Sequence, residues 1–94
     1  MRESVVEKKV TDYAKANGWL SFKWVSPSQR GVPDRMYFKN GSLVIIEFKA
    51  PGKTATPYQL AIHRRLSAVG FTVHVIDDIE KTTIVDGKGT ELLC

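Results

Sequence analysis

The stretch PDRMYFKNGSLVIIEFK, residues Pro33 to Lys49, decides the fold expected of this chain. Two runs rich in strand-forming residues, Asp34–Lys39 and Leu43–Lys49, flank Asn40-Gly41, which is the strongest short-range signal for a β-hairpin. The near-continuous apolar run LVII in the second strand is typical of a strand buried on both faces. These residues therefore predict a hairpin at the centre of a sheet.

The same hairpin predicts that two acidic side chains face each other. With a two-residue loop, Asp34 lies directly opposite Glu47, since each is six residues from the loop, and their Cβ atoms come within about 5 Å. Side chains alternate along a strand, so Lys49 shares the face of Glu47. Like charges directly opposite each other are destabilising, unless one carboxyl stays protonated, a basic group lies between them or a cation is bound.

A divalent cation is the remedy that would give these residues a catalytic use. Mg²⁺ takes oxygen ligands and is commonly held by one or two carboxylates, waters and substrate phosphate, so Asp34 and Glu47 are the expected ligands. A bound metal generates a nucleophilic water near neutral pH, and Lys49 would orient or deprotonate that water or stabilise charge on the phosphate. Glu7, on the first predicted helix, would complete or modulate the metal shell, with Glu3 as the alternative one turn earlier. The cluster thus predicts a centre for phosphodiester hydrolysis.

Helices and further strands are predicted around the hairpin. Thr56 as N-cap, Pro57 in the first turn and Gln59 closing a capping box indicate a helix after it. Because a helix joins the third and fourth strands, these strands pair in parallel. The predicted fold class is α/β, a single domain over residues 1–94 with a mixed sheet flanked by helices in the order α-β-β-β-α-β. The other expected elements are helix Glu3–Asn17, strand Trp19–Val25, helix Pro57 to about Val69, strand Phe71–Ile76, a short edge strand Thr83–Val85 and a turn Asp86–Gly89.

Composition and charge limit the class of protein. A chain of 94 residues with 43% hydrophobic side chains matches one small globular domain rather than a disordered segment. The net charge of +4 favours a polyanionic partner. The single cysteine, Cys94, excludes an internal disulfide, and no signal-peptide pattern or bilayer-spanning apolar run is present. We therefore expect a soluble cytoplasmic protein with no membrane partner, and so short a chain often gains stability by pairing with a second copy.

Gly31-Val32-Pro33-Asp34, the segment IEFKAPG at 46–52 and Gln59 together resemble the VRR-Nuc branch of the PD-(D/E)xK nuclease superfamily. The resemblance extends from Glu3 to about Glu80. It implies a restriction-endonuclease-like core, DNA cleavage that depends on Mg²⁺ or on Mn²⁺ in its place, and metal ligation by the backbone carbonyl of Phe48. Compact, stand-alone members resemble Holliday-junction resolvases that act as homodimers. The resemblance thus also implies a homodimer that cuts branched DNA in a bacterial or phage-infected cell.

Other polar residues have both a structural and a functional interpretation. Gln59 closes a capping box and is also a candidate catalytic residue. His63 and His74 are expected on a helix surface and a strand, without the spacing of metal ligands. Basic and hydroxyl side chains flank the proposed site and would bind backbone phosphates, which position DNA without reading its sequence. These candidates are Lys23, Ser26, Ser28, Gln29, Arg30 and Lys53.

Three functions are compatible with these residues. The first is a metal-dependent endonuclease selective for branched DNA such as four-way junctions. The second is a nicking, flap or restriction-type nuclease, although no segment is typical of a base-reading element. The third is a non-catalytic DNA-binding module of the same fold, which the presence of Asp34, Glu47 and Lys49 disfavours.

Overall fold

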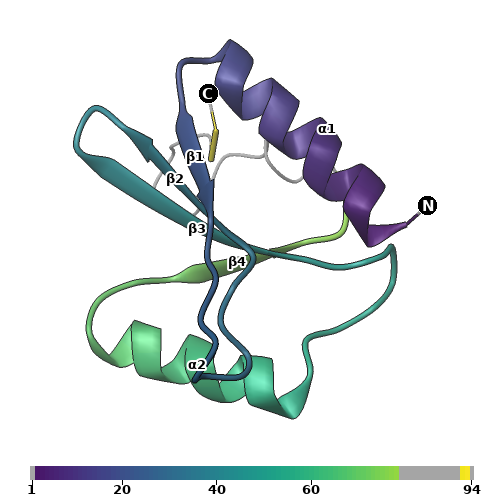
Figure 1. Ribbon diagram of the computed structural model, residues 1–94, viewed down its shortest axis with the longest axis vertical. Helices are drawn as coiled ribbons and strands as arrows, with labels where there is room; N and C mark the ends of the chain where they lie inside the picture. The colour runs from purple at the N-terminus through teal and green to yellow at the C-terminus, as the bar shows by residue number, and fades with distance from the viewer. Residues whose placement is uncertain (1, 79–91, 94) are drawn as a thin grey trace.

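A four-stranded sheet in the order β1-β2-β3-β4 forms the centre of the computed structural model, which describes residues 2–78 and 92–93 (Figure 1). β1 pairs with β2 and β2 with β3 antiparallel, whereas β3 and β4 are parallel. The predicted element order and mixed sheet are confirmed; the predicted strand Thr83–Val85, the turn Asp86–Gly89 and Cys94 lie outside the described residues. The elements are α1 (Glu3–Ala16), β1 (Leu20–Lys23), β2 (Arg35–Lys39), β3 (Ser42–Phe48), α2 (Pro57–Ala68) and β4 (Val73–Ile76).

The β2–β3 hairpin turns through two residues, as predicted. Asn40 and Gly41 have φ angles of 50° and 77°, the positive values that a type I′ turn requires at both central positions. Lys39 pairs with Ser42 across the turn, and the ladder continues to the pair of Arg35 and Ile46. The next residues along the two strands are the two acids of the predicted site.

Helix α1 covers one face of the sheet. Val6, Val10 and Ala14, which lie at helical spacing, are buried in the same core cluster as Tyr37 and Phe48. The buried hydroxyls of Thr11 and Tyr37 are hydrogen-bonded at 2.9 Å. The remaining buried members of this cluster are Trp19, Ile46, Ile76 and Leu93.

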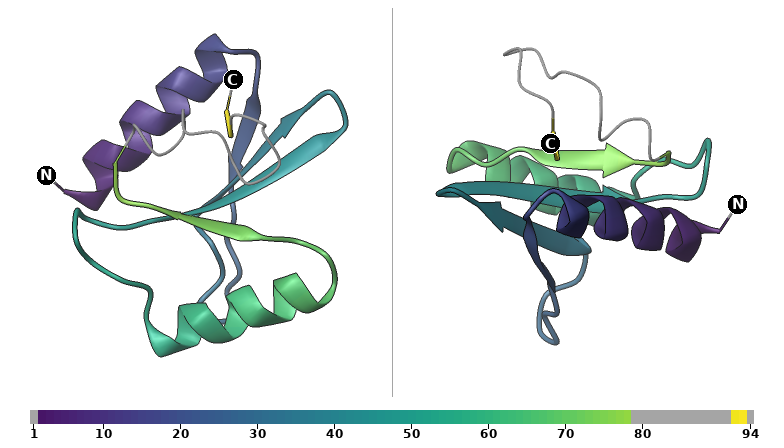
Figure 2. Two further views of the ribbon diagram at one scale, coloured as in Figure 1. Left: turned by 180° about the vertical axis from the view of Figure 1, so that it is seen from behind. Right: turned by 90° about the horizontal axis from the view of Figure 1, so that it is seen from above.

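Helix α2 lies on the opposite face (Figures 1 and 2). Its buried residue Ile62 is on the side of Ile45 and Glu47, whose side chains alternate with those that face α1. The Thr56 side chain accepts a hydrogen bond from the Gln59 amide at 3.3 Å, and the Gln59 side chain accepts one from the Thr56 amide at 2.9 Å. The predicted capping box is thus confirmed. Neither of the helices described here is long and apolar enough to cross a membrane.

Two strands begin later than predicted because helix caps use their first residues. The Trp19 amide donates to the Ala14 carbonyl at 3.0 Å, and the Phe71 amide donates to the Leu66 carbonyl at 2.9 Å. Each bond closes the C-terminus of the preceding helix across a glycine of positive φ, as in a Schellman motif. β1 and β4 therefore start at Leu20 and Val73.

The loop between β1 and β2 packs against the start of α2 (Figure 1). Gly31 has a φ of 86°, and a Cβ atom added there would lie 2.5 Å from the backbone oxygen of Tyr58. The Arg30 guanidinium lies over the Tyr58 ring, 4.2 Å from its centroid. Only glycine permits this backbone conformation and close approach at low cost, so Gly31 joins the segment before Asp34 to α2.

Candidate active site

Asp34 and Glu47 lie next to each other at the end of the hairpin, as the register predicted. Asp34 directly precedes β2, where its backbone amide donates to the Ile46 carbonyl at 3.1 Å. Its carboxylate oxygen Oδ2 accepts a hydrogen bond of 2.7 Å from the amide of Phe48. Glu47 in β3 is only 1% exposed. The backbone amide of Phe48 therefore fixes the Asp34 carboxylate, and the sheet buries the Glu47 carboxyl next to it.

Burial and the neighbouring charge change the protonation of Glu47. Its burial, followed by the negative charge of Asp34, raises the pKa of Glu47 to about 8, while Lys49 acts in the opposite direction. The Glu47 carboxyl therefore carries a proton at neutral pH when no cation is present. This is one of the three remedies for opposed acids, and a bound cation would displace the proton.

Helix α2 directs two side chains at Glu47. Gln59 Nε2 donates to Glu47 Oε2 at 3.0 Å, so Gln59 both caps α2 and contacts the acid. One turn later, His63 Nε2 lies 3.6 Å from Glu47 Oε1. His63 Nε2 and Glu47 Oε1 are both buried without a hydrogen-bond partner. A polar group of a ligand or a water that reaches this point would therefore find unsatisfied partners.

His63 is the contact that the sequence did not reveal, because it was expected on a helix surface. Its side chain is only 13% exposed. Burial and the nearby positive charge of Lys49 lower the pKa of His63, so it is neutral at physiological pH. The available signal was its spacing of four residues from Gln59, which places both on one face of the helix.

Lys49 lies in the same charged cluster. It is 9% exposed, and its backbone amide donates to the Ile76 carbonyl at 3.0 Å, but its ammonium group makes no hydrogen bond or ion pair within residues 2–78 and 92–93. Its charge lowers the pKa of Glu47, although less than burial and Asp34 raise it. Its ammonium group is therefore available to a ligand.

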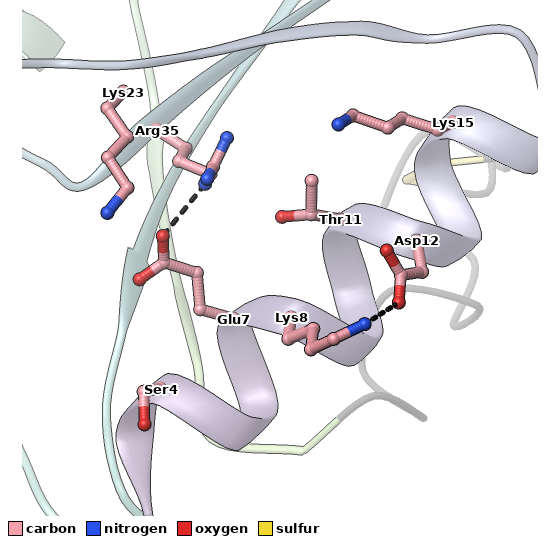
Figure 3. Close-up of a pocket in the computed structure, with 8 residues that line it drawn as sticks. All are labelled: Ser4, Glu7, Lys8, Thr11, Asp12, Lys15, Lys23 and Arg35. Atoms are coloured by element: carbon pink, nitrogen blue, oxygen red, sulfur yellow. Dashed lines mark hydrogen bonds and ion pairs between the residues drawn. The ribbon is translucent and has the colours of Figure 1, made fainter.

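The structure separates the two candidate acids of α1. Glu7 forms an ion pair of 2.8 Å with Arg35, whose side chain lies on the α1 face of the sheet and not on the face of Asp34 (Figure 3). Glu7, predicted for the metal shell, thus has a basic partner on the α1 face. Burial, followed by the negative charge of Asp34, raises the pKa of Glu3, and Glu3 in turn raises that of Glu47. The first turn of α1 reaches the cluster, whereas the next turn meets Arg35.

The candidate DNA contacts lie in two different places. Lys23 of β1 lies opposite Arg35 of β2 in the strand register, and it lines a groove beside α1. Gln29 and Arg30 are held on the α2 side, where Gln29 Oε1 lies 3.5 Å from Arg65 and the Arg30 guanidinium lies over Tyr58. Ser28 and Lys53 are exposed and Ser26 is half-buried.

The donor set fits a hard divalent cation. No cluster of three or more Asp, Glu, His or Cys side chains arranged to hold a metal occurs in residues 2–78 and 92–93. Two carboxylates suffice for Mg²⁺, which completes its octahedron with waters, carbonyls and substrate phosphate. Glu47 Oε1 has no hydrogen-bond partner, with His63 Nε2 3.6 Å away, and is a ligand atom that a cation would satisfy. Phe48, the expected carbonyl ligand, directly follows Glu47, and its amide is hydrogen-bonded to the Asp34 carboxylate.

Comparison with known proteins supports the sequence resemblance. No family model matches the chain. It is 42% identical over 86 residues to "Putative nuclease p44" of Acyrthosiphon pisum secondary endosymbiont phage 1, covering 90% of this chain and 92% of that protein. Its fold is similar to that of a solved structure described as a "VRR_NUC domain", with a TM-score of 0.76 and 26% identity over 83% of this chain and 86% of that chain. The predicted restriction-endonuclease-like α/β fold is therefore confirmed.

Proposed function

The chain belongs to the VRR-Nuc family of nucleases, and on that premise we propose that it is a Mg²⁺-dependent endonuclease that hydrolyses branched DNA such as Holliday junctions. The observation that carries the proposal is the pair formed by Asp34 and the buried Glu47. A fold without use for these charges would place apolar side chains there, since burying an acid costs free energy. Mn²⁺ would substitute for Mg²⁺ because it accepts the same oxygen ligands.

Each residue of the cluster has a chemical task in this proposal. Asp34, Glu47 and the backbone carbonyl of Phe48 would hold the cation. When bound, the cation would polarise the scissile phosphate and lower the pKa of a water. Lys49 donates to the phosphate oxygen on which charge develops, or orients the attacking water. Gln59 fixes the orientation of the Glu47 carboxyl through its 3.0 Å hydrogen bond.

Glu3 replaces Glu7 as the helix acid in this proposal. It is Glu3 whose charge acts on Glu47, while Glu7 is already paired with Arg35. A third carboxylate in the field of a cation stabilises it without having to touch it. Glu3 would hold a metal-bound water at the open side of the site.

A homodimer is the assembly that branched DNA favours. Leu20, Phe22 and Phe38 are 57%, 55% and 37% exposed, and the two rings are in contact at 6.4 Å between centroids. These residues form an apolar patch on edge strand β1 and its neighbour, on the face that carries Asp34. Two-fold pairing through the patch would present two equivalent active sites on one side of the dimer.

A panel of DNA structures tests the proposal. Purified protein is incubated with a four-way junction, a flap, single strands and plain duplex, each with Mg²⁺, with Mn²⁺ and with chelator. We expect junction cleavage that chelator abolishes and that Asp34→Asn reduces at least 100-fold, an order typical of removing transition-state charge stabilisation. Asp78→Asn, the same change at an exposed position, serves as the matched control.

The other outcomes identify the other functions. Equal cleavage of flap or plain duplex indicates a nicking, flap or restriction-type nuclease. DNA binding without cleavage under any metal condition indicates a non-catalytic module, and defeats the proposal. Because the relative named p44 comes from a phage, we propose that the reaction takes place in a phage-infected bacterial cell.

A further inference from the structure

A groove on the α1 face of the sheet has no role in the reaction proposed above. It lies between α1 and the β1 edge and has a volume of about 290 Å³. Figure 3 shows the helix forming one wall, with Lys23 and Arg35 from the strands opposite. It is lined by Ser4, Glu7, Lys8, Thr11, Asp12, Lys15, Lys23 and Arg35.

The groove carries an excess of positive charge. Its two acids are both neutralised, since Glu7 pairs with Arg35 at 2.8 Å and Asp12 pairs with Lys8 at 2.7 Å. The two remaining cations are Lys15 on α1 and Lys23 on β1. Neither ammonium forms a hydrogen bond or an ion pair within residues 2–78 and 92–93. The groove thus presents two lysines without an ion pair from opposite walls, although the charge of Lys15 acts on Asp12.

The groove is adjacent in sequence and along the strands to the acidic pair, on the other face of the sheet. Lys23 pairs with Arg35, the residue directly after Asp34. The next residue of β1, Trp24, donates its amide to the Asp34 carbonyl at 2.9 Å. Asp34 and Arg35 point to opposite faces because strand side chains alternate. A polyanion that leaves the acidic cluster around the β1 edge therefore meets Lys23 and then Lys15.

We infer that this groove is a second phosphate-binding site, which takes backbone phosphates of DNA away from the scissile bond. The inference rests on the proposed DNA substrate. Phosphate contacts by lysine position a duplex without reading its sequence, and each one releases condensed counterions. The groove therefore fixes how the DNA lies across the protein, while the opposite face of the sheet cuts it.

Salt-dependent binding tests the inference. The affinity for a fluorescent four-way junction is measured by anisotropy in Ca²⁺, so that bound DNA is not cut, over a series of NaCl concentrations. Lys15→Gln and Lys23→Gln are each expected to lower the slope of log K against log salt by about 0.9, and the double variant by about 1.8. Lys9→Gln is the matched control, because Lys9 is an exposed lysine of the same helix outside the groove.

The outcomes separate this inference from the proposed function. If the wild type binds junction DNA and both groove variants keep its slope and affinity, the groove inference is overturned and the nuclease proposal stands. If the wild type binds no DNA, both are overturned. Saturable binding of inorganic phosphate that the double variant loses, with unchanged DNA affinity, would identify a site for a free anion and overturn the assignment to DNA.

Discussion

Glu47 is the residue at which fold stability and the proposed chemistry oppose each other. In the folded, cation-free protein its pKa is raised from 4.5 to about 8. Between these two values the folded state holds a proton that the unfolded state has released. Stability is therefore fully present below about pH 4.5 and is lost as the pH rises through about 8, by about 1.4 kcal/mol per pH unit at most.

Replacing Glu47 by Gln removes this dependence. Glu47→Gln keeps the shape of the protonated acid and cannot ionise, so we expect its stability in chelator to change less between pH 5 and pH 8 than that of the wild type. Urea midpoints measured across this range give the comparison. A wild type whose stability does not fall with rising pH would show that the carboxyl is already ionised when folded.

Sequence alone reached Asp34, Glu47 and Lys49 because the hairpin is local. Its turn type fixes the loop length, the loop length fixes the register, and the register places the acids together. His63 and Glu3 required tertiary information, because each depends on how a helix is rotated and tilted against the sheet. Glu7 was predicted as the helix acid with Glu3 as the alternative, and both lie on α1 at helical spacing, so only packing decides which one Arg35 takes.

At the scale of elements, the capping of α2 is coupled to the acidic cluster through Gln59. The same side chain closes the capping box and donates to Glu47. Thr56→Ala removes only the cap and should cost about 1 kcal/mol of stability without changing Mn²⁺ affinity. Gln59→Leu should cost a similar amount and also weaken Mn²⁺ binding. Calorimetric titration of both variants checks this, and equal Mn²⁺ affinity in the two would contradict the coupling.

The contact between the β1–β2 loop and α2 depends on Gly31. Gly31→Ala would place a Cβ atom 2.5 Å from the Tyr58 oxygen in addition to straining the backbone. Gly70→Ala is the matched control, since it shares a positive φ and has open space around it. We expect the control to cost about 1 kcal/mol from backbone strain and Gly31→Ala to cost more. Chemical denaturation measures both, and equal losses would mean that the close approach does not stabilise the loop.

Element types and order were predictable because each segment has a clear period and clear end signals. Their bounds shifted by one or two residues where Gly18 and Gly70 allow the chain to close a helix before entering a strand. The pattern of residue types does not show that Trp19 and Phe71 donate back to the helix. The contact of Gly31 with α2 was equally hidden, because it joins residues 27 positions apart.

At the scale of the whole molecule, the exposed patch of Leu20, Phe22 and Phe38 would be covered in a dimer. Phe22→Ser should shift the protein toward the monomer in light scattering coupled to size exclusion. Val69→Ser, at another exposed apolar side chain on the far end of α2, should leave the mass unchanged. A wild type that is monomeric at all accessible concentrations would remove the proposed dimer and leave the active site as described.

The central claim is that Asp34 and Glu47 together bind a divalent cation, and Mn²⁺ calorimetry at pH 8 tests it without any assumption about DNA. The wild type should bind Mn²⁺ with release of a proton from Glu47, and Asp34→Asn should lose that binding while remaining folded. Absence of Mn²⁺ binding by the folded wild type, or equal binding by Asp34→Asn, would contradict the account.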